Sequence, residues 1–315
     1  MTATAQVLVA DAEMRDDVLA TLSQIPRTLS CRWLYDDRGS ELFEEITHLP
    51  EYYPTRTELA ILEAHLAEIA AFIGAGTPII EYGAGSGRKS ELLIEAVAPS
   101  RYIPIDIAED FLGLTAGRIA ARFPGTRVEP FVADFAQPFA HDFAPAERRA
   151  GFFPGSTLGN LDREQAGAFL SRMREHTGQG GCAVIGIDLV KPLGTLLPAY
   201  DDAQGVTAAF NLNLLERLNR ELGASFDTGA FLHEARWNDR EQAVEMHLVS
   251  QREQRVTVAG QSFLFAAGET IHTESSRKFT LEGFAELAAH AGWSMGQTWR
   301  DPLERFSLVG LVPTA

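Results

Sequence analysis

The stretch from Pro78 to Ser90, which reads PIIEYGAGSGRKS, constrains the fold more than any other part of the chain. Two isoleucines predict a short buried strand, an acidic residue follows at Glu81, and glycines then occur at alternate positions, at 83, 85 and 87. Glycine allows the sharp turn and lets the backbone lie close to a ligand. A strand, a glycine turn and a helix form the first unit of a doubly wound nucleotide-binding sheet. Taken alone, the pattern also fits a dinucleotide dehydrogenase or an ordinary strand-to-helix turn.

Strands and helices alternate on both sides of this turn, which predicts a parallel sheet. The expected strands are 101–106, 128–134 and 180–188, with a further strand that begins at 151 and runs into a loop by 161, and the expected helices are 57–72, 110–122 and 163–175. Near the C-terminus, 293–299 and 306–312 predict an antiparallel hairpin around Asp301 and Pro302.

Acidic residues mark the ends of the first three expected strands, at Glu81, Asp106 and Asp134. An acid after the second strand can bind both hydroxyls of a ribose. Dinucleotide-binding proteins rarely need another acid after the third strand. The order of acids, with Phe135 beside Asp134, resembles S-adenosylmethionine-dependent enzymes of the seven-stranded class.

Two further segments exceed what such a core needs, and we expect them to form a second α+β domain. The N-terminal segment is rich in aromatic residues and includes an expected helix at 16–23. The later segment combines an expected helix at 206–222 with four strand-like stretches between 230 and 265. The predicted division is a Rossmann-like core at 56–189 and 279–315 and a substrate-binding domain at 1–55 and 190–278.

Composition narrows the class of protein. The net charge of −16 repels phosphate backbones, so we expect no nucleic-acid partner. The two cysteines, Cys31 and Cys182, lie far apart, which indicates neither a disulfide framework nor a metal site. Acidic residues near the N-terminus argue against a signal peptide, and no apolar run reaches the length of a membrane span. We therefore expect a cytoplasmic, monomeric protein without a metal and without membrane contact.

Several longer motifs resemble the histidine N-alpha-methyltransferases of ergothioneine biosynthesis, and the resemblance covers nearly the whole chain. They are LPEYYPTRTE (49–58), GSTLGNL (155–161), DLVK (188–191), AYDDAQGVTAAFNLNLL (199–215), LNRELGA (218–224), AAGETIHTESSRKF (266–279) and W-x-D-P (299–302). The resemblance implies a seven-stranded methyltransferase core with a substrate domain. It also implies that the chain trimethylates the α-amino group of L-histidine, with S-adenosylmethionine as donor, to give the betaine hercynine.

The resemblance also implies roles for individual residues. Asn160 should hold the substrate amine, Tyr52 and Tyr200 should bind the substrate carboxylate, and these three are the expected catalytic residues. Glu274 and Ser276 should bind the imidazole ring. The expected substrate-binding residues are Phe43, Tyr52, Asn160, Tyr200, Met246, Glu274 and Ser276. The expected donor-binding residues are Tyr35, Gly83, Lys89, Asp106, Asp134 and Phe135.

The residue types suit this chemistry. The attacking amine must be neutral, and the Asn160 amide can accept its N–H without adding charge that would stabilise an ammonium. Glu274 can accept from a ring N–H, and Ser276 lies on the same side of a strand two residues later. The small residues Gly155, Ser156 and Gly159 should leave room for a growing methylated amine. Asp201 and Asp202 are interpreted as helix caps.

Two other functions stay open. The chain could methylate another free amino acid, such as a tryptophan-like one, although Glu274 and Met246 favour histidine. It could also be a non-catalytic paralogue that binds a nucleoside, although Asn160, Glu274 and the donor acids argue against this.

Overall fold

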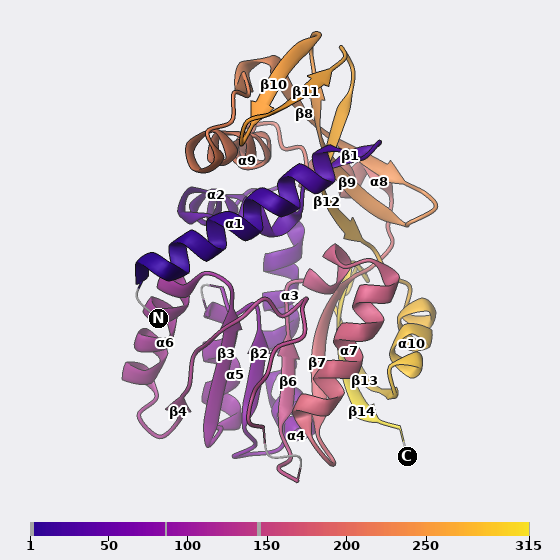
Figure 1. Cartoon of the computed structure of the whole chain (residues 1–315). Coiled ribbons are helices and arrows are strands. Elements are labelled where there is room, and N and C mark those ends of the chain that lie inside the picture. Colours follow the sequence, from indigo (N-terminus) through magenta and orange to yellow (C-terminus); the bar gives the residue numbers. More distant parts are fainter. Residues whose placement is uncertain (1–2, 86, 144–145, 315) are drawn as a thin grey trace. The chain divides into compact units, whose positions relative to one another are not determined.

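The computed structural model of the chain describes residues 3–85, 87–143 and 146–314. The chain divides into two compact units, and each is built from two separate stretches (Figure 1). Unit 1 comprises Met1–Tyr53 and Pro192–Ser276, and unit 2 comprises Pro54–Lys191 and Arg277–Ala315.

Unit 2 contains one twisted sheet whose strands run in the order β13-β14-β7-β6-β2-β3-β4, with β5 also pairing with β3 (Figure 1). Strands β2, β3, β6 and β7 are mutually parallel, and β14 runs antiparallel to both β7 and β13. This confirms the predicted Rossmann-like core and its terminal hairpin. The strands are β2 (Ile79–Tyr82), β3 (Arg101–Asp106), β4 (Arg127–Val128), β5 (Phe131–Val132), β6 (Ala150–Phe153), β7 (Cys182–Asp188), β13 (Trp293–Arg300) and β14 (Phe306–Pro313).

The expected third strand is broken into two short pieces. Both β4 and β5 pair in parallel with β3, on either side of Pro130. Proline has no N–H to donate to the ladder, so the pairing is interrupted there. The second piece ends at Val132, and Asp134 therefore lies in the following loop rather than at the end of a strand.

Helices cover both faces of this sheet, because alternate strand residues enter separate hydrophobic clusters. Ile79 packs in a cluster with residues of α3, α4 and α5, and Ile80 packs in a cluster with residues of α7 and α10. The helical segments are α3 (Tyr53–Ala64), α4 (Leu66–Ile73), α5 (Arg88–Val97), α6 (Glu109–Arg122), η2 (Thr157–Asn160), α7 (Arg163–Thr177) and α10 (Leu281–His290). The single helix expected at 57–72 is two helices that meet at His65.

Unit 1 is an α+β domain, as predicted. Its larger sheet has the order β1-β12-β9-β8, and β10 and β11 form a separate hairpin. The strands are β1 (Arg27–Thr28), β8 (Phe231–Asn238), β9 (Ala243–Ser250), β10 (Gln254–Val258), β11 (Gln261–Phe265) and β12 (Thr270–Arg277). The helical segments are α1 (Ala3–Leu22), η1 (Cys31–Leu34), α2 (Asp37–Thr47), α8 (Leu193–Leu196), η3 (Leu197–Ala199), α9 (Val206–Leu222) and η4 (Thr228–Ala230).

Two helix starts in unit 1 test the sequence expectations. The α1 helix begins at Ala3, well before the expected residue 16, because alanine, leucine, glutamine and glutamate continue the helix without a break. At the start of α9, the Asp202 carboxylate accepts the backbone N–H groups of Gln204, Val206 and Thr207 at 3.0, 3.1 and 2.7 Å. The interpretation of Asp202 as a helix cap is confirmed. Within the described part of the chain, no helix is both long and apolar enough to cross a membrane.

Glu81 is a buried carboxyl group near the end of β2. Its side chain is 1% exposed, and the Tyr102 hydroxyl donates to its Oε2 at 2.6 Å. Burial raises the pKa of Glu81 to about 7, and the hydrogen bond from Tyr102 opposes the rise. The carboxyl group therefore takes up a proton on folding over much of the weakly acidic range.

Replacing this group should change how stability depends on pH. The folded chain holds the Glu81 proton between pH 4.5 and 7, whereas the unfolded chain has lost it. As the pH rises through this window, the free energy of unfolding of the wild type should therefore fall by about 3 kcal/mol relative to that of Glu81→Gln. Urea unfolding of both proteins between pH 5 and 8 measures the difference, with the exposed Glu63→Gln as control. A difference between Glu81→Gln and wild type that does not vary with pH would contradict the assignment.

Candidate functional site

A glycine turn follows β2 at the point where the strand order reverses, with β3 on one side of β2 and β6 on the other. Gly83, Gly85 and Gly87 have φ angles of 70°, 49° and 69°, which are left-handed conformations that favour glycine. Crevices at such a reversal are where open α/β sheets bind their ligands.

The Asp106 carboxylate lies directly beside this turn. Its Oδ2 accepts the backbone N–H of Gly85 at 3.2 Å, and its Oδ1 accepts that of Ala108 at 3.1 Å. On the same turn, a methyl group at Gly83 would lie 3.4 Å from the ring of Phe135. Three residues expected to contact the donor, Gly83, Asp106 and Phe135, are thereby brought together.

The loop that carries Phe135 is held by side chains that bind its backbone. The Asp134 carboxylate accepts the N–H of Ala136 at 2.9 Å. The Arg172 guanidinium donates to the carbonyl oxygens of Phe135 and Ala136 at 3.1 and 2.8 Å. The Phe135 ring also packs edge-on against Phe153, with ring centres 5.2 Å apart. These contacts fix Phe135, an expected donor-binding residue, against the sheet.

Lys89, another expected donor contact, lies in the first turn of α5 and is ion-paired with Glu58 of α3. The Glu58 side chain is 1% exposed, and its two oxygens accept the backbone N–H of Gly155 at 2.9 and 2.8 Å. Sequence analysis assigned no role to Glu58, although it ends the first family motif.

The loop after β6 leads to Asn160 and contains two consecutive left-handed residues, Gly155 and Ser156, at φ angles of 85° and 57°. A left-handed serine is strained and persists only where its surroundings hold it. Here the Ser156 hydroxyl accepts the backbone N–H of Asp188 at 2.8 Å. Asn160 is the last residue of the short helix η2 that follows.

The far end of this loop is tied to Arg277. Its guanidinium donates to the carbonyl oxygen of Leu161 at 2.9 Å. A methyl group at Gly159 would lie only 2.6 Å from the Arg277 carbonyl oxygen. The expectation that Gly159 leaves room for a substrate is therefore wrong, because the main chain of Arg277 already fills that space.

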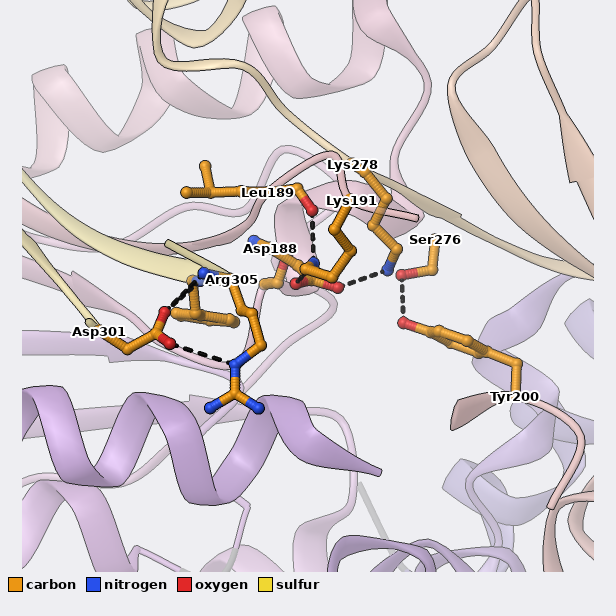
Figure 2. A network of polar contacts seen from close by, with 10 residues as sticks. Asp188, Leu189, Lys191, Tyr200, Ser276, Lys278, Asp301 and Arg305 are labelled. Carbon is orange, nitrogen blue, oxygen red and sulfur yellow. Dashed lines mark hydrogen bonds and ion pairs between the residues drawn. The ribbon is translucent and has the colours of Figure 1, made fainter. Parts of the chain in front are cut away.

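A buried ion-pair cluster lies at the end of β7. Asp188 is fully buried, and its two oxygens lie 2.5 Å from Lys191 Nζ and 2.9 Å from Lys278 Nζ (Figure 2). Lys191 also donates to the carbonyl oxygen of Leu189. Burial lowers the pKa of Lys191 to about 8, and the Asp188 carboxylate opposes this shift. Asp188 thus joins residues that precede and follow the long unit 1 stretch in the sequence.

In unit 1, four predicted site residues belong to one aromatic cluster. Neighbouring ring centres are 5.6 Å apart for Tyr35 and Phe43, 6.1 Å for Phe43 and Tyr52, and 6.2 Å for Tyr52 and Tyr200. Phe210 of α9 packs against both Tyr35 and Phe43. Phe210 was not among the predicted site residues.

Strand β12 supplies polar groups to this cluster. The Ser276 and Tyr200 hydroxyls are 2.8 Å apart, and either can be the donor (Figure 2). Glu274 is 8% exposed on a strand that lies inside the sheet, so it is not a solvated edge residue. Burial, followed by the charge of Glu274, raises the pKa of Tyr35 well above its ordinary value. The Glu274 carboxylate therefore acts electrostatically on the Tyr35 hydroxyl.

His233, which sequence analysis did not identify, supports Tyr200 through its backbone carbonyl group. Its Nε2 lies 2.7 Å from the Tyr200 carbonyl oxygen, and its Nδ1 lies 2.9 Å from Asn211 Nδ2. An amide nitrogen only donates, so Nδ1 accepts and Nε2–H donates, which is the neutral imidazole. Burial lowers the pKa of His233, in agreement with this tautomer. Tyr200 is thus held at its hydroxyl and at its backbone.

The predicted site residues therefore form two sets. Unit 1 carries Tyr35, Phe43, Tyr52, Tyr200, Met246, Glu274 and Ser276, and Met246 is buried on β9, next to β12. Unit 2 carries Gly83, Lys89, Asp106, Asp134, Phe135 and Asn160. Among residues 3–85, 87–143 and 146–314, no group of three or more histidine, cysteine, aspartate or glutamate residues could hold a metal ion.

A family model and several known proteins are similar to this chain over most of its length. A family model described as a histidine-specific, S-adenosylmethionine-dependent methyltransferase matches residues 14–313. A histidine N-alpha-methyltransferase of Mycolicibacterium smegmatis is 42% identical, over 96% of this chain and 97% of the relative. Ergothioneine biosynthesis protein 1 of Neurospora crassa is 29% identical over 87% of this chain and 32% of its own length.

The fold has a counterpart among solved structures. An S-adenosylmethionine-dependent methyltransferase from Clostridium acetobutylicum superposes with a TM-score of 0.52, over 87% of this chain and 98% of the other, at 10% identity. At that identity the likeness concerns the fold alone. It agrees with the Rossmann-like core of unit 2.

The Asp188 cluster should be a major contributor to the stability of unit 2. Asp188→Asn leaves two buried ammonium groups without their carboxylate and should lower the free energy of unfolding by about 3–5 kcal/mol. Adding Lys278→Met should recover part of the loss, because one buried charge is removed. Urea unfolding followed by tryptophan fluorescence measures both, with the exposed Glu95→Gln expected to cost less than about 1 kcal/mol. A loss for Asp188→Asn no larger than that of the control would refute this role.

Proposed function

The chain belongs to the family of histidine-specific, S-adenosylmethionine-dependent methyltransferases, and on this premise we propose that it methylates the α-amino group of L-histidine. Three transfers to one nitrogen give the trimethylated betaine hercynine, the first step of ergothioneine biosynthesis. The observation that carries the proposal is the buried carboxylate of Glu274, on the same strand as the Ser276 that contacts Tyr200, in a chain 42% identical to a histidine N-alpha-methyltransferase.

We assign the donor to unit 2, in line with the predicted core at 56–189 and 279–315. The glycine turn is free of side chains at three positions, so backbone can lie against a nucleoside. Asp106 stands beside the turn, where it can accept from ribose hydroxyls, and Phe135 offers an apolar surface for adenine. Lys89 supplies a cation for the donor carboxylate.

We assign histidine recognition to unit 1, the predicted substrate domain at 1–55 and 190–278. Glu274 accepts from an imidazole N–H, and its burial makes that hydrogen bond stronger than it would be in water. The Tyr52 and Tyr200 hydroxyls donate to the substrate carboxylate without adding a full positive charge. Phe43 and Met246 complete an apolar lining that excludes water.

S-adenosylmethionine supplies an already activated methyl group, so the chain has to align the acceptor and keep it deprotonated. The Asn160 amide oxygen can accept an amine N–H and leave the nitrogen lone pair available. A carboxylate at this position would instead stabilise the protonated amine. The hydrogen bonds made by Gly155, Ser156 and Leu161 support this role, because they hold the loop that carries the amide.

Mass spectrometry of a reaction with S-adenosylmethionine and L-histidine tests the function directly. The expected product is heavier than histidine by three methyl groups, and a panel of free amino acids should give no comparable product. Methylation of a tryptophan-like amino acid instead would retain the donor assignment and discard the role of Glu274. Donor binding without any methylated product would favour the non-catalytic paralogue.

Glu274→Gln should weaken histidine binding selectively. Losing a charge-assisted hydrogen bond costs about 1.5–3 kcal/mol, so the KM for histidine should rise about 10- to 100-fold. The affinity for S-adenosylhomocysteine, measured by calorimetry, should stay the same. Glu245→Gln, on the neighbouring strand β9 and outside the aromatic cluster, is the matched control. An unchanged KM for histidine in Glu274→Gln would refute the imidazole role.

A further inference from the structure

We propose that Glu58 is a positioning residue that holds both the Lys89 ammonium and the loop carrying Asn160. The proposal rests on the proposed function, since Lys89 and Asn160 take their roles from it. It goes beyond that function by assigning to one buried side chain the relative placement of a donor-binding group and an amine-binding group, both within unit 2.

The contacts of Glu58 join two segments that follow different strands. Lys89 lies in the first turn of the helix after β2, and Gly155 is the second residue of the loop after β6. Glu58 makes an ion pair with the first and accepts the backbone N–H of the second with both oxygens, at 2.9 and 2.8 Å. Strands β2 and β6 are adjacent and parallel, so these segments start from the same edge of the sheet.

The carboxylate has almost no freedom to move. Glu58 is 1% exposed, and a methyl group at Gly186 of β7 would lie 2.1 Å from its Oε1. The backbone of β7 therefore closes the space beside this oxygen. Burying a carboxylate is costly unless it is paired and hydrogen-bonded, which the Lys89 and Gly155 contacts provide.

Both partners of Glu58 need an external restraint. Lysine has a long flexible stem, so without an ion pair its ammonium would sample many positions. Lys89 Nζ also lies 3.9 Å from where a methyl group at Gly155 would be, so the two partners are neighbours. Gly155 lies near the start of a loop in which the next residue, Ser156, is left-handed and strained. The Glu58 hydrogen bond fixes the start of this loop and hence the direction of its course toward Asn160.

Two variants separate the effect of Glu58 on Lys89 from its effect on the loop that carries Asn160. Glu58→Gln removes the charge that holds Lys89 but keeps an oxygen that can accept the Gly155 N–H. Lys89 is then no longer held where it meets the donor carboxylate. Losing that one charge-assisted hydrogen bond should raise the KM for S-adenosylmethionine and the Kd for S-adenosylhomocysteine about 10-fold, with kcat within about 3-fold of wild type. Glu58→Ala removes both contacts and should in addition lower kcat about 10-fold or more.

The matched control is Glu91→Gln on α5, the helix that carries Lys89. Glu91 is also a buried carboxylate, and it pairs with Arg118 and Arg122 rather than with a site residue. It should lower the melting temperature without changing the Kd for S-adenosylhomocysteine or the KM for S-adenosylmethionine. Glu58→Gln should differ from it in both constants, which a purely structural role would not produce.

The outcomes are decisive in each direction. If Glu58→Gln lowers the melting temperature but leaves both donor constants unchanged, as the control does, Glu58 is only a structural residue and the proposal is wrong. If Glu58→Ala keeps the kcat of Glu58→Gln, its part in placing the loop is refuted. Calorimetry with S-adenosylhomocysteine needs no methyl acceptor. The measurement of donor binding would therefore still test the role of Glu58 if the chain failed to methylate histidine. In that case kcat is measured with the amino acid that the panel identifies.

Discussion

A parallel sheet buried on both faces can place charged groups only at its strand ends, and unit 2 depends on how those charges are paired. Every residue of β2 and β7 is buried. The carboxylates at the strand ends accept backbone N–H groups, as Asp106 does, or lie against ammonium groups, as Asp188 does. Because a buried charge is costly unless satisfied, each pairing also fixes the course of the loop that supplies the partner.

The sequence predicts this architecture well where the signal is local. Alternating apolar strands and amphipathic helices, the glycine turn and the terminal hairpin are read from neighbouring residues, and all of them are present. Pro130 shows a signal that was available and not used, since a residue without an N–H interrupts the strand that leads toward Asp134. The start of α1 is a second such case, because the helix-forming residues before position 16 allow the helix to begin earlier than expected.

Contacts between distant residues could not be predicted in this way. Glu58 and Gly155 are 97 positions apart, and His233 and Tyr200 are 33 apart. A family motif can mark such residues as belonging to a site, yet it does not say what they touch. Gly159 illustrates the consequence: a small residue beside Asn160 suggests space for a substrate, whereas the close approach of the Arg277 main chain accounts for the glycine.

Charged and neutral groups have different tasks in this chain. The carboxylate of Glu58 and the backbone of Asp188 hold the loop after β6 at Gly155 and Ser156, and the last residue of the short helix in that loop is the neutral amide of Asn160. An attacking amine needs this separation, because a carboxylate in contact with it would favour the ammonium form, whereas a carboxylate behind the loop can restrain the amide without reaching the amine. In the proposed arrangement, the charged hydrogen bond of Glu58 would restrain the neutral amide of Asn160 through the backbone between them.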